Sequence, residues 1–162
     1  PGISVKLSAL HPRFSMKQRD RVLKELSPKV IQLARMAKDA NLNFTIDAEE
    51  ADTLALLLEV FEKCAIEPSL KKWSGLGLAV QAYQKRASTV LNWLTTLANE
   101  QQRGLMIRLV KGAYWDTELK LAQVAGLSGY PVFTRKACTD LNYLACAKQL
   151  LEASPLIYPQ FA

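Results

Sequence analysis

Strand-like and helix-like patterns alternate along the chain, and this alternation limits the possible folds more than any other feature. Short apolar runs that predict strands lie at residues 3–7, 43–46, 78–80, 104–110 and from residue 156 onward. Between them, apolar residues recur every three or four positions, which is typical of amphipathic helices. The predicted helices cover residues 18–40, 49–63, 87–100, 116–125 and a long segment that Thr139 caps and that ends at Leu151. Strands joined by helices pair in parallel, so the pattern predicts an α/β fold.

Two parallel architectures are compatible with this alternation, an open doubly wound sheet and a (β/α) barrel. No Gly-x-Gly-x-x-Gly motif follows any predicted strand; Gly75 and Gly77 precede one instead and indicate a turn. Polar side chains end every predicted strand, as in barrel enzymes. We therefore expect about five units of a (β/α)8 barrel that this chain alone does not close. Residues 1–162 are then the central portion of a barrel domain, truncated at both ends.

Composition excludes some classes of protein. The 162 residues are 49% hydrophobic and 22% charged, as in a globular domain, and no apolar run is long enough to cross a membrane. The net charge of +6 is spread along the chain, which argues against a nucleic-acid-binding surface. Three cysteines without metal-ligand spacing predict no metal site, and they favour reduced thiols in a reducing compartment.

Chemistry-bearing residues follow the first three predicted strands. A lysine next to a strand is costly without an anionic partner, which favours a functional role for Lys6. Asp47 is suited either to a ligand site or to the N-cap of the next helix, and both roles stay open. The amide of Gln81 can pair with a flat heterocycle, although a satisfied buried glutamine is an equal alternative. His11, the single histidine, precedes Pro12 and is expected to be structural.

The fourth predicted strand ends in the segment RLVKGAYWD at residues 108–116. Arg108 offers a planar fork and Lys111 a point charge, a combination suited to a cofactor's ring and phosphates. Gly112 and Ala113 let a ligand approach the backbone, and the next helix offers free N–H groups. Tyr114 and Trp115 are suited to lining a pocket or to packing. Carboxylate, amide, arginine and lysine around one cavity favour an organic redox cofactor.

Several motifs together resemble the proline dehydrogenase family, over essentially the whole chain. They are GISVKLSALHPR at residues 2–13, IDAEE at 46–50, QAYQKR at 81–86, RLVKGAYWD at 108–116, YPVFTRK at 130–136, YLACA at 143–147 and YPQFA at 158–162. The longer RLVKGAYWD segment is most similar to bacterial members in which the barrel is fused to a pyrroline-5-carboxylate dehydrogenase. The resemblance implies a distorted (β/α)8 barrel that holds FAD at the carboxyl ends of its strands.

The resemblance also implies a reaction and residue roles. L-Proline would lose a hydride to flavin N5 and give Δ1-pyrroline-5-carboxylate, the first step of proline catabolism. Asp47 and Arg108 would be the catalytic pair, with Arg108 beside the flavin, while Lys6 and Tyr114 would bind proline. The other residues that would bind FAD are Ala48, Gln81, Lys111, Gly112 and Ala113, with Trp115 and Thr134 as weaker candidates.

The same resemblance implies properties of the longer protein. Electrons would pass to a membrane quinone, so a cytoplasmic protein with peripheral membrane contact and a fused aldehyde dehydrogenase domain is expected. The resemblance assigns no nucleic-acid contact to this segment. Without the remaining barrel strands the 162 residues are expected to be inactive alone. The alternative is a non-catalytic barrel segment with a structural or regulatory role, against which the joint presence of Lys6, Asp47, Gln81, Arg108 and Lys111 argues.

Overall fold

The computed structural model describes residues 1–153 and 155–162 and contains one parallel sheet. Its strands follow the order β1-β2-β3-β4-β5 across the sheet, and each pairs in parallel with the next. The strands are β1 (Gly2–Val5), β2 (Asn43–Ile46), β3 (Leu76–Gln81), β4 (Leu105–Val110) and β5 (Ile157–Phe161). Sequential order across the sheet is the order of a (β/α) barrel, whereas a doubly wound sheet reverses direction at a switch point. The sheet is therefore an open part of a barrel wall, as predicted.

The connections between the strands are helical. They contain α1 (Leu7–Leu10), η1 (Met16–Gln18), α2 (Arg19–Glu25), α3 (Ser27–Asp39), η2 (Ala51–Thr53), α4 (Leu54–Ala65), η3 (Pro68–Leu70), α5 (Ala87–Gln101), α6 (Trp115–Val124) and α7 (Lys136–Leu151). None of these helices, among the residues described, is long and apolar enough to cross a membrane.

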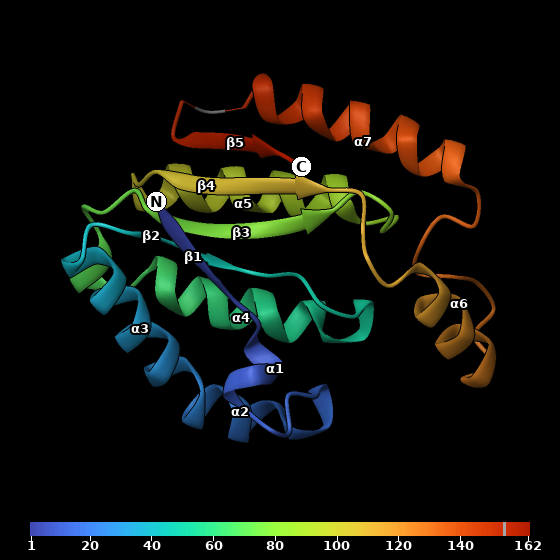
Figure 1. Ribbon diagram of the computed structural model, residues 1–162, viewed down its shortest axis with the longest axis horizontal. Coiled ribbons are helices and arrows are strands. Elements are labelled where there is room, and N and C mark those ends of the chain that lie inside the picture. The colour runs from blue at the N-terminus through green and yellow to red at the C-terminus, as the bar shows by residue number, and fades with distance from the viewer. Residues whose placement is uncertain (154) are drawn as a thin grey trace.

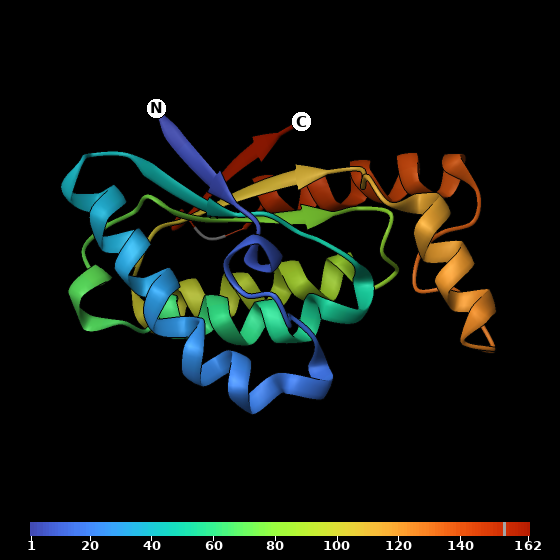
Figure 2. The same ribbon diagram turned by 60° about the horizontal axis from the view of Figure 1, so that its bottom comes forward.

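The main core lies between one face of the sheet and the helices. Figures 1 and 2 show α3, α4 and α5 on the same side of the sheet, while α7 runs alongside β5 and α6 projects beyond the end of β4. Alternate strand residues such as Ile46, Leu78 and Ile107 are buried in this core. Their neighbours point to the opposite face because side chains alternate along a strand. That second face carries Ser4, Thr45, Ala79 and Arg108.

The first strand and the first two connections differ from the sequence-based prediction at several boundaries. The predicted strand 3–7 ends at Val5, because the Ser8 N–H donates to Glu49 Oε1 at 3.0 Å and turns the chain into α1. Residues 18–40 divide at Leu26 into two helices; Leu26 occupies the N-cap position of the second, and Pro28 lies in its first turn. The helix predicted from residue 49 begins with η2, and Glu50 precedes it.

Two predictions about local structure were wrong. Thr139 does not cap the last helix; it lies buried inside α7, and the carbonyl of Arg135 accepts the N–H groups of Cys138 and Thr139. Gly77 is not in a turn but inside β3. A Cβ there would lie 2.8 Å from the Met106 carbonyl oxygen and 2.9 Å from Thr45 Oγ1, so the glycine permits close packing of three strands.

A buried arginine connects the end of α4 to the segment before β4. Arg103 is 2% exposed, and its Nη1 donates to the carbonyl of Ala65 at 2.7 Å while Nη2 donates to that of Trp73 at 3.0 Å. Burial lowers the pKa of Arg103. The final carbonyls of a helix have no partner within the helix, so a cation there supplies hydrogen bonds and offsets the negative end of the dipole.

We expect Arg103→Ala to lower the free energy of unfolding by about 3 kcal/mol, because carbonyls in the interior lose charged donors. Thermal unfolding of the full-length protein measures this loss, with Arg135→Ala as a control at an exposed arginine. Equal melting temperatures for the two variants would contradict a stabilising role for Arg103.

Candidate active site

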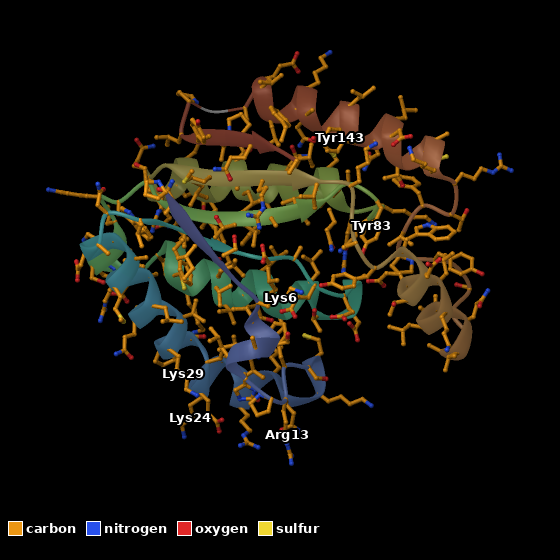
Figure 3. The ribbon with its side chains drawn as sticks, viewed as in Figure 1. Lys6, Arg13, Lys24, Lys29, Tyr83 and Tyr143 are labelled. Atoms are coloured by element: carbon orange, nitrogen blue, oxygen red, sulfur yellow. The ribbon has the colours of Figure 1, made fainter. Side chains whose placement is uncertain are left out.

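The candidate residues lie at the carboxyl ends of four neighbouring strands. Figure 3 shows Lys6 where β1 passes into α1, and Tyr83 beyond the end of β3. Asp47 directly follows β2, Gln81 ends β3, and Lys111 directly follows β4. Because parallel strands present their carboxyl ends at one edge, the topology brings together residues that lie far apart in the sequence.

An ion pair across the sheet is the central feature of the site. Arg108 Nη2 donates to Asp47 Oδ1, and Nη1 donates to Ser4 Oγ at 3.0 Å. Arg108 pairs in register with Ala79 of β3, whose small side chain leaves room for the guanidinium to reach β1 and β2. The side chains of Arg108 and Asp47 are 28% and 25% exposed, so the pair is partly shielded yet accessible to a ligand. Asp47 therefore fixes Arg108 and does not cap a helix.

Lys6 lies beside an aromatic ring. Its Nζ is 5.8 Å from the centroid of the Tyr114 ring. The Tyr114 side chain raises the pKa of Lys6, and the carboxylates of Glu49 and Asp47 add to this effect. Lys6 is exposed and keeps its positive charge beside the ring, so its ammonium is chemically suited to attract a small anion.

Two residues that the sequence did not single out, Ser8 and Glu49, fix the start of α1 directly after Lys6. Glu49 is 6% exposed, and its carboxylate accepts hydrogen bonds from the N–H and the hydroxyl of Ser8. This contact joins α1, directly after Lys6, to the loop after Asp47. The IDAEE motif contains Glu49, but its partner lies 41 residues away, so spacing alone could not reveal the contact.

A chain of polar side chains continues from Gln81. Gln84 Nε2 donates to Gln81 Oε1 at 2.7 Å, and Arg86 Nε donates to Gln84 Oε1 at 3.1 Å. Arg86 Nη2 also donates to the carbonyl of Ala51. Gln81 and Gln84 are 4% and 3% exposed. Gln81 is therefore buried, and its side-chain oxygen has a hydrogen-bond partner, as the alternative of a satisfied buried glutamine predicted for that atom.

Lys111 takes part in a small network of opposite charges. Its Nζ lies 2.7 Å from Asp140 Oδ1, and Lys136 Nζ lies 2.6 Å from Asp140 Oδ2. Hydrogen bonds from Lys111 and then from Lys136 lower the pKa of Asp140, and the Asp140 carboxylate raises the pKa of Lys111. Lys111 was singled out from the sequence, whereas Asp140 was not; it lies on α7, which packs so that its carboxylate reaches Lys111.

Gly112 has a conformation that other residues adopt with strain. Its φ is +130°, and a Cβ would lie 2.5 Å from the Tyr83 ring. The backbone of Gly112 therefore packs against an aromatic face just beyond β4. We expect Gly112→Ala to destabilise the protein by about 2 kcal/mol or more, since strain and overpacking add.

The melting temperature of the full-length Gly112→Ala protein measures this effect. Gly129→Ala is the matched control, because a Cβ at Gly129 meets no atom within 4 Å. A Gly112→Ala protein that melts with the control would show that the Tyr83 ring yields without cost.

The chain is similar in sequence to proteins of one known family. The family model for proline dehydrogenase matches residues 1–162. The bifunctional protein PutA of Salmonella typhimurium is 57% identical over 162 residues, and that of Rhizobium meliloti is 51% identical over 144 residues. The chain belongs to the proline dehydrogenase family. These matches cover 100% and 89% of the chain, but the chain spans only 12% of the length of each relative.

Solved structures of the family have the same arrangement of elements. A structure of proline utilization A (PutA) with proline bound in remote sites has a TM-score of 0.98 and 63% identity. That match covers 99% of this chain and 16% of the solved chain. PutA from Bdellovibrio bacteriovorus, inactivated by N-propargylglycine, has a TM-score of 0.93 and 35% identity over 98% of this chain and 16% of that one. The barrel architecture is thus confirmed.

The remaining residues that the proline dehydrogenase resemblance singled out lie in the segments that follow β2 and β4. Ala48 follows Asp47, and Ala113 follows Gly112, each in a loop at a strand end. Trp115 begins α6, and its Nε1 donates to the carbonyl of Phe133 at 2.8 Å. Thr134 is exposed in the loop before α7. Trp115 therefore ties α6 to the loop that carries Thr134.

A hollow that the sequence did not indicate lies between η2 and α6. Its volume is about 600 Å³, and its walls include Arg86, Glu118, Leu121 and Val124. Glu118 is 3% exposed and accepts a hydrogen bond from the Ala51 N–H at 2.6 Å. Burial raises the pKa of Glu118. None of the residues Lys6, Asp47 and Arg108 lines this hollow.

Proposed function

We propose that this chain forms part of the active site of a flavoenzyme that oxidises L-proline to Δ1-pyrroline-5-carboxylate. The single observation that carries the proposal is the Asp47–Arg108 ion pair on the open face of the sheet, with Lys6 at the same edge. Membership of the proline dehydrogenase family supports the substrate. So does the inactivation of one relative by N-propargylglycine, a secondary amino acid as proline is.

The residues present fit FAD. The amide of Gln81, the guanidinium of Arg108 and the ammonium of Lys111 are donors at neighbouring strand ends, and such donors suit a heterocycle and a phosphate chain. The Tyr83 ring fills the space beside the Gly112 α-carbon, so Gly112 shapes the backbone after β4, while the small side chains of Ala48 and Ala113 leave room at the ends of β2 and β4. Trp115 and Thr134 border the same region. When bound, FAD supplies a two-electron acceptor for the hydride that L-proline loses.

The protein side chains bind and orient the substrate. We assign to Lys6 the capture of the proline carboxylate, since its charge is exposed beside Tyr114. Tyr114 forms one wall for the proline ring. Arg108 provides a cation that offsets negative charge as the site is reduced, and Asp47 holds that cation in position. Orientation of this kind lowers the entropic part of the barrier.

The proposal extends to the longer protein. Residues 1–162 are the central portion of its barrel, and electrons pass from it to a membrane quinone through peripheral membrane contact of a cytoplasmic protein. A fused aldehyde dehydrogenase domain oxidises the product further; the two relatives described above are named bifunctional. The 162 residues alone are inactive, because β1 and β5 leave strand edges unpaired and one face of the sheet uncovered.

The test uses the full-length protein from its natural reading frame. We expect a visible flavin absorption band that bleaches when L-proline is added without oxygen. A flavin band that stays unchanged would contradict L-proline as the substrate but would still support FAD as the cofactor. No flavin, even after FAD is supplied, would favour a non-catalytic role for this barrel segment. Proline-dependent activity of the isolated 162 residues would contradict the assignment of inactivity.

A further inference from the structure

The hydrogen bonds between Gln81, Gln84 and Arg86 have a direction that chemistry determines. An amide can reverse its oxygen and nitrogen, so its orientation depends on its partners. A guanidinium only donates hydrogen bonds. Arg86 Nε carries one hydrogen, and it lies 3.1 Å from the Gln84 amide. The amide atom facing Arg86 must therefore be the oxygen of Gln84.

The orientation that Arg86 imposes on the Gln84 amide also determines the orientation of the Gln81 amide. Because the oxygen of Gln84 faces Arg86, its Nε2 faces Gln81 and donates at 2.7 Å. Gln81 must then present its own oxygen to Gln84. Its Nε2 makes no hydrogen bond to another side chain or backbone group in the described part of the chain. The atom of Gln81 that is left for a ligand is a donor.

Both ends of this chain of bonds are held in place. The Tyr83 N–H donates to the Lys111 carbonyl at 2.7 Å, and the Lys85 N–H donates to the Pro131 carbonyl at 3.0 Å. These bonds fix the backbone on both sides of Gln84. Arg86 is fixed in turn by the carbonyl of Ala51. The loop after β3 therefore has little freedom to let the amides turn over.

We propose that Arg86 and Gln84 are positioning residues that fix the amide of Gln81, so that its Nε2 faces the cofactor as a hydrogen-bond donor. The inference rests on the proposed function, in which Gln81 binds FAD. It selects the chemistry that Gln81 recognises, an acceptor edge of the heterocycle such as a carbonyl oxygen or an unprotonated ring nitrogen. A ligand that offered a donor at this point would be rejected.

One substitution reverses the direction of the bonds with little change in shape. In Gln84→Glu, one carboxylate oxygen accepts from Arg86 and the other faces Gln81, which then turns its nitrogen inward and its oxygen toward the cofactor. We expect the Kd of FAD for the full-length apoprotein to rise at least tenfold. Gln84→Met removes the bonds without imposing the wrong direction, so its Kd should rise no more than about threefold. A purely structural role for Gln84 predicts the opposite ranking, because Met leaves buried polar groups without partners.

A double-mutant comparison separates the direction of the amide from the added charge. In a Gln81→Leu background, Gln84→Glu should change the Kd of FAD by less than about twofold, because nothing remains to be turned. A tenfold effect that persists in this background would overturn the proposal and indicate charge acting at a distance. Gln32→Glu, an exposed position on α3, controls for the charge.

Binding of FAD to the wild type is measured first, by quenching of flavin fluorescence. A wild type that binds no FAD would overturn both the proposed function and this inference. A wild type that binds FAD and bleaches with L-proline, together with equal Kd values for Gln84→Glu and Gln84→Met, would overturn the inference alone. If Gln84→Glu does not fold, Arg86→Gln takes its place. A glutamine at position 86 no longer imposes a direction, so the Kd should rise about threefold, and an unchanged Kd would overturn the proposal.

Discussion

Replacing Arg108 with methionine should lower kcat/KM for L-proline by about 10²- to 10³-fold, the usual cost of removing a charge-stabilising donor from an active site. Methionine keeps much of the length of the side chain but removes the positive charge and both hydrogen bonds to Asp47 and Ser4. The Asp47 carboxylate would then lack its cation on the open face of the sheet. The variant should therefore lose the positive charge that offsets reduction and gain an unbalanced negative one.

The measurement is the rate of flavin bleaching by L-proline, without oxygen, in the full-length protein. Arg13→Met is a matched control, since Arg13 is exposed and Figure 3 places it well away from Lys6 and the strand ends. Asp47→Ala tests the other half of the ion pair and should also slow bleaching. An Arg108→Met protein that keeps FAD and reacts within about threefold of the wild type would rule out a catalytic role for Arg108.

Replacing Lys6 with methionine should raise KM for L-proline by about 10- to 100-fold, the range expected for one lost hydrogen bond to a charged group. A change in kcat should be much smaller, because in the proposed role Lys6 contacts the proline carboxylate and not the reacting bond. The raised pKa of Lys6 means that the ammonium is present throughout the neutral range, so the effect should not depend on pH between about 6 and 9.

The comparison with Lys29→Met isolates this role. Lys29 is exposed on α3, and Figure 3 shows it away from Lys6, so its loss should leave both kinetic constants unchanged. A Lys6→Met protein with wild-type KM would show that another residue binds the proline carboxylate. A fall in kcat with an unchanged KM would instead place Lys6 in the chemical step.

Local patterns predicted the fold class well, because they report local physics. The period of apolar residues distinguishes strands from helices over a few residues, and β2 was predicted at its observed bounds. Helix ends were less predictable, since they depend on partners. Thr139 is a good capping residue by type, yet the carbonyl of Arg135 starts α7 earlier. The sequence around Gly77 predicted a turn, but the glycine is needed inside β3 because atoms of the neighbouring strands leave no room for a side chain.

The candidate site divides in the same way. Residue type and position at a strand end were enough to single out Lys6, Asp47, Gln81 and Arg108. Their partners could not be read from spacing, because Ser4 lies 104 residues from Arg108 and Glu49 lies 41 residues from Ser8. Asp140, which pairs with Lys111, lies on α7, 29 residues further along the chain.

The sequence by itself determined the alternation of strands and helices, the parallel α/β class and the polar residues that end the strands. Family membership also follows from sequence, since the family model matches residues 1–162. Only the tertiary structure decided which of those residues meet. Side-by-side packing of β1, β2, β3 and β4 brings Ser4, Asp47 and Arg108 together, and it joins Arg86 to Ala51. The physical reason is that hydrogen bonding between strands aligns their ends in space, whatever the length of chain between them.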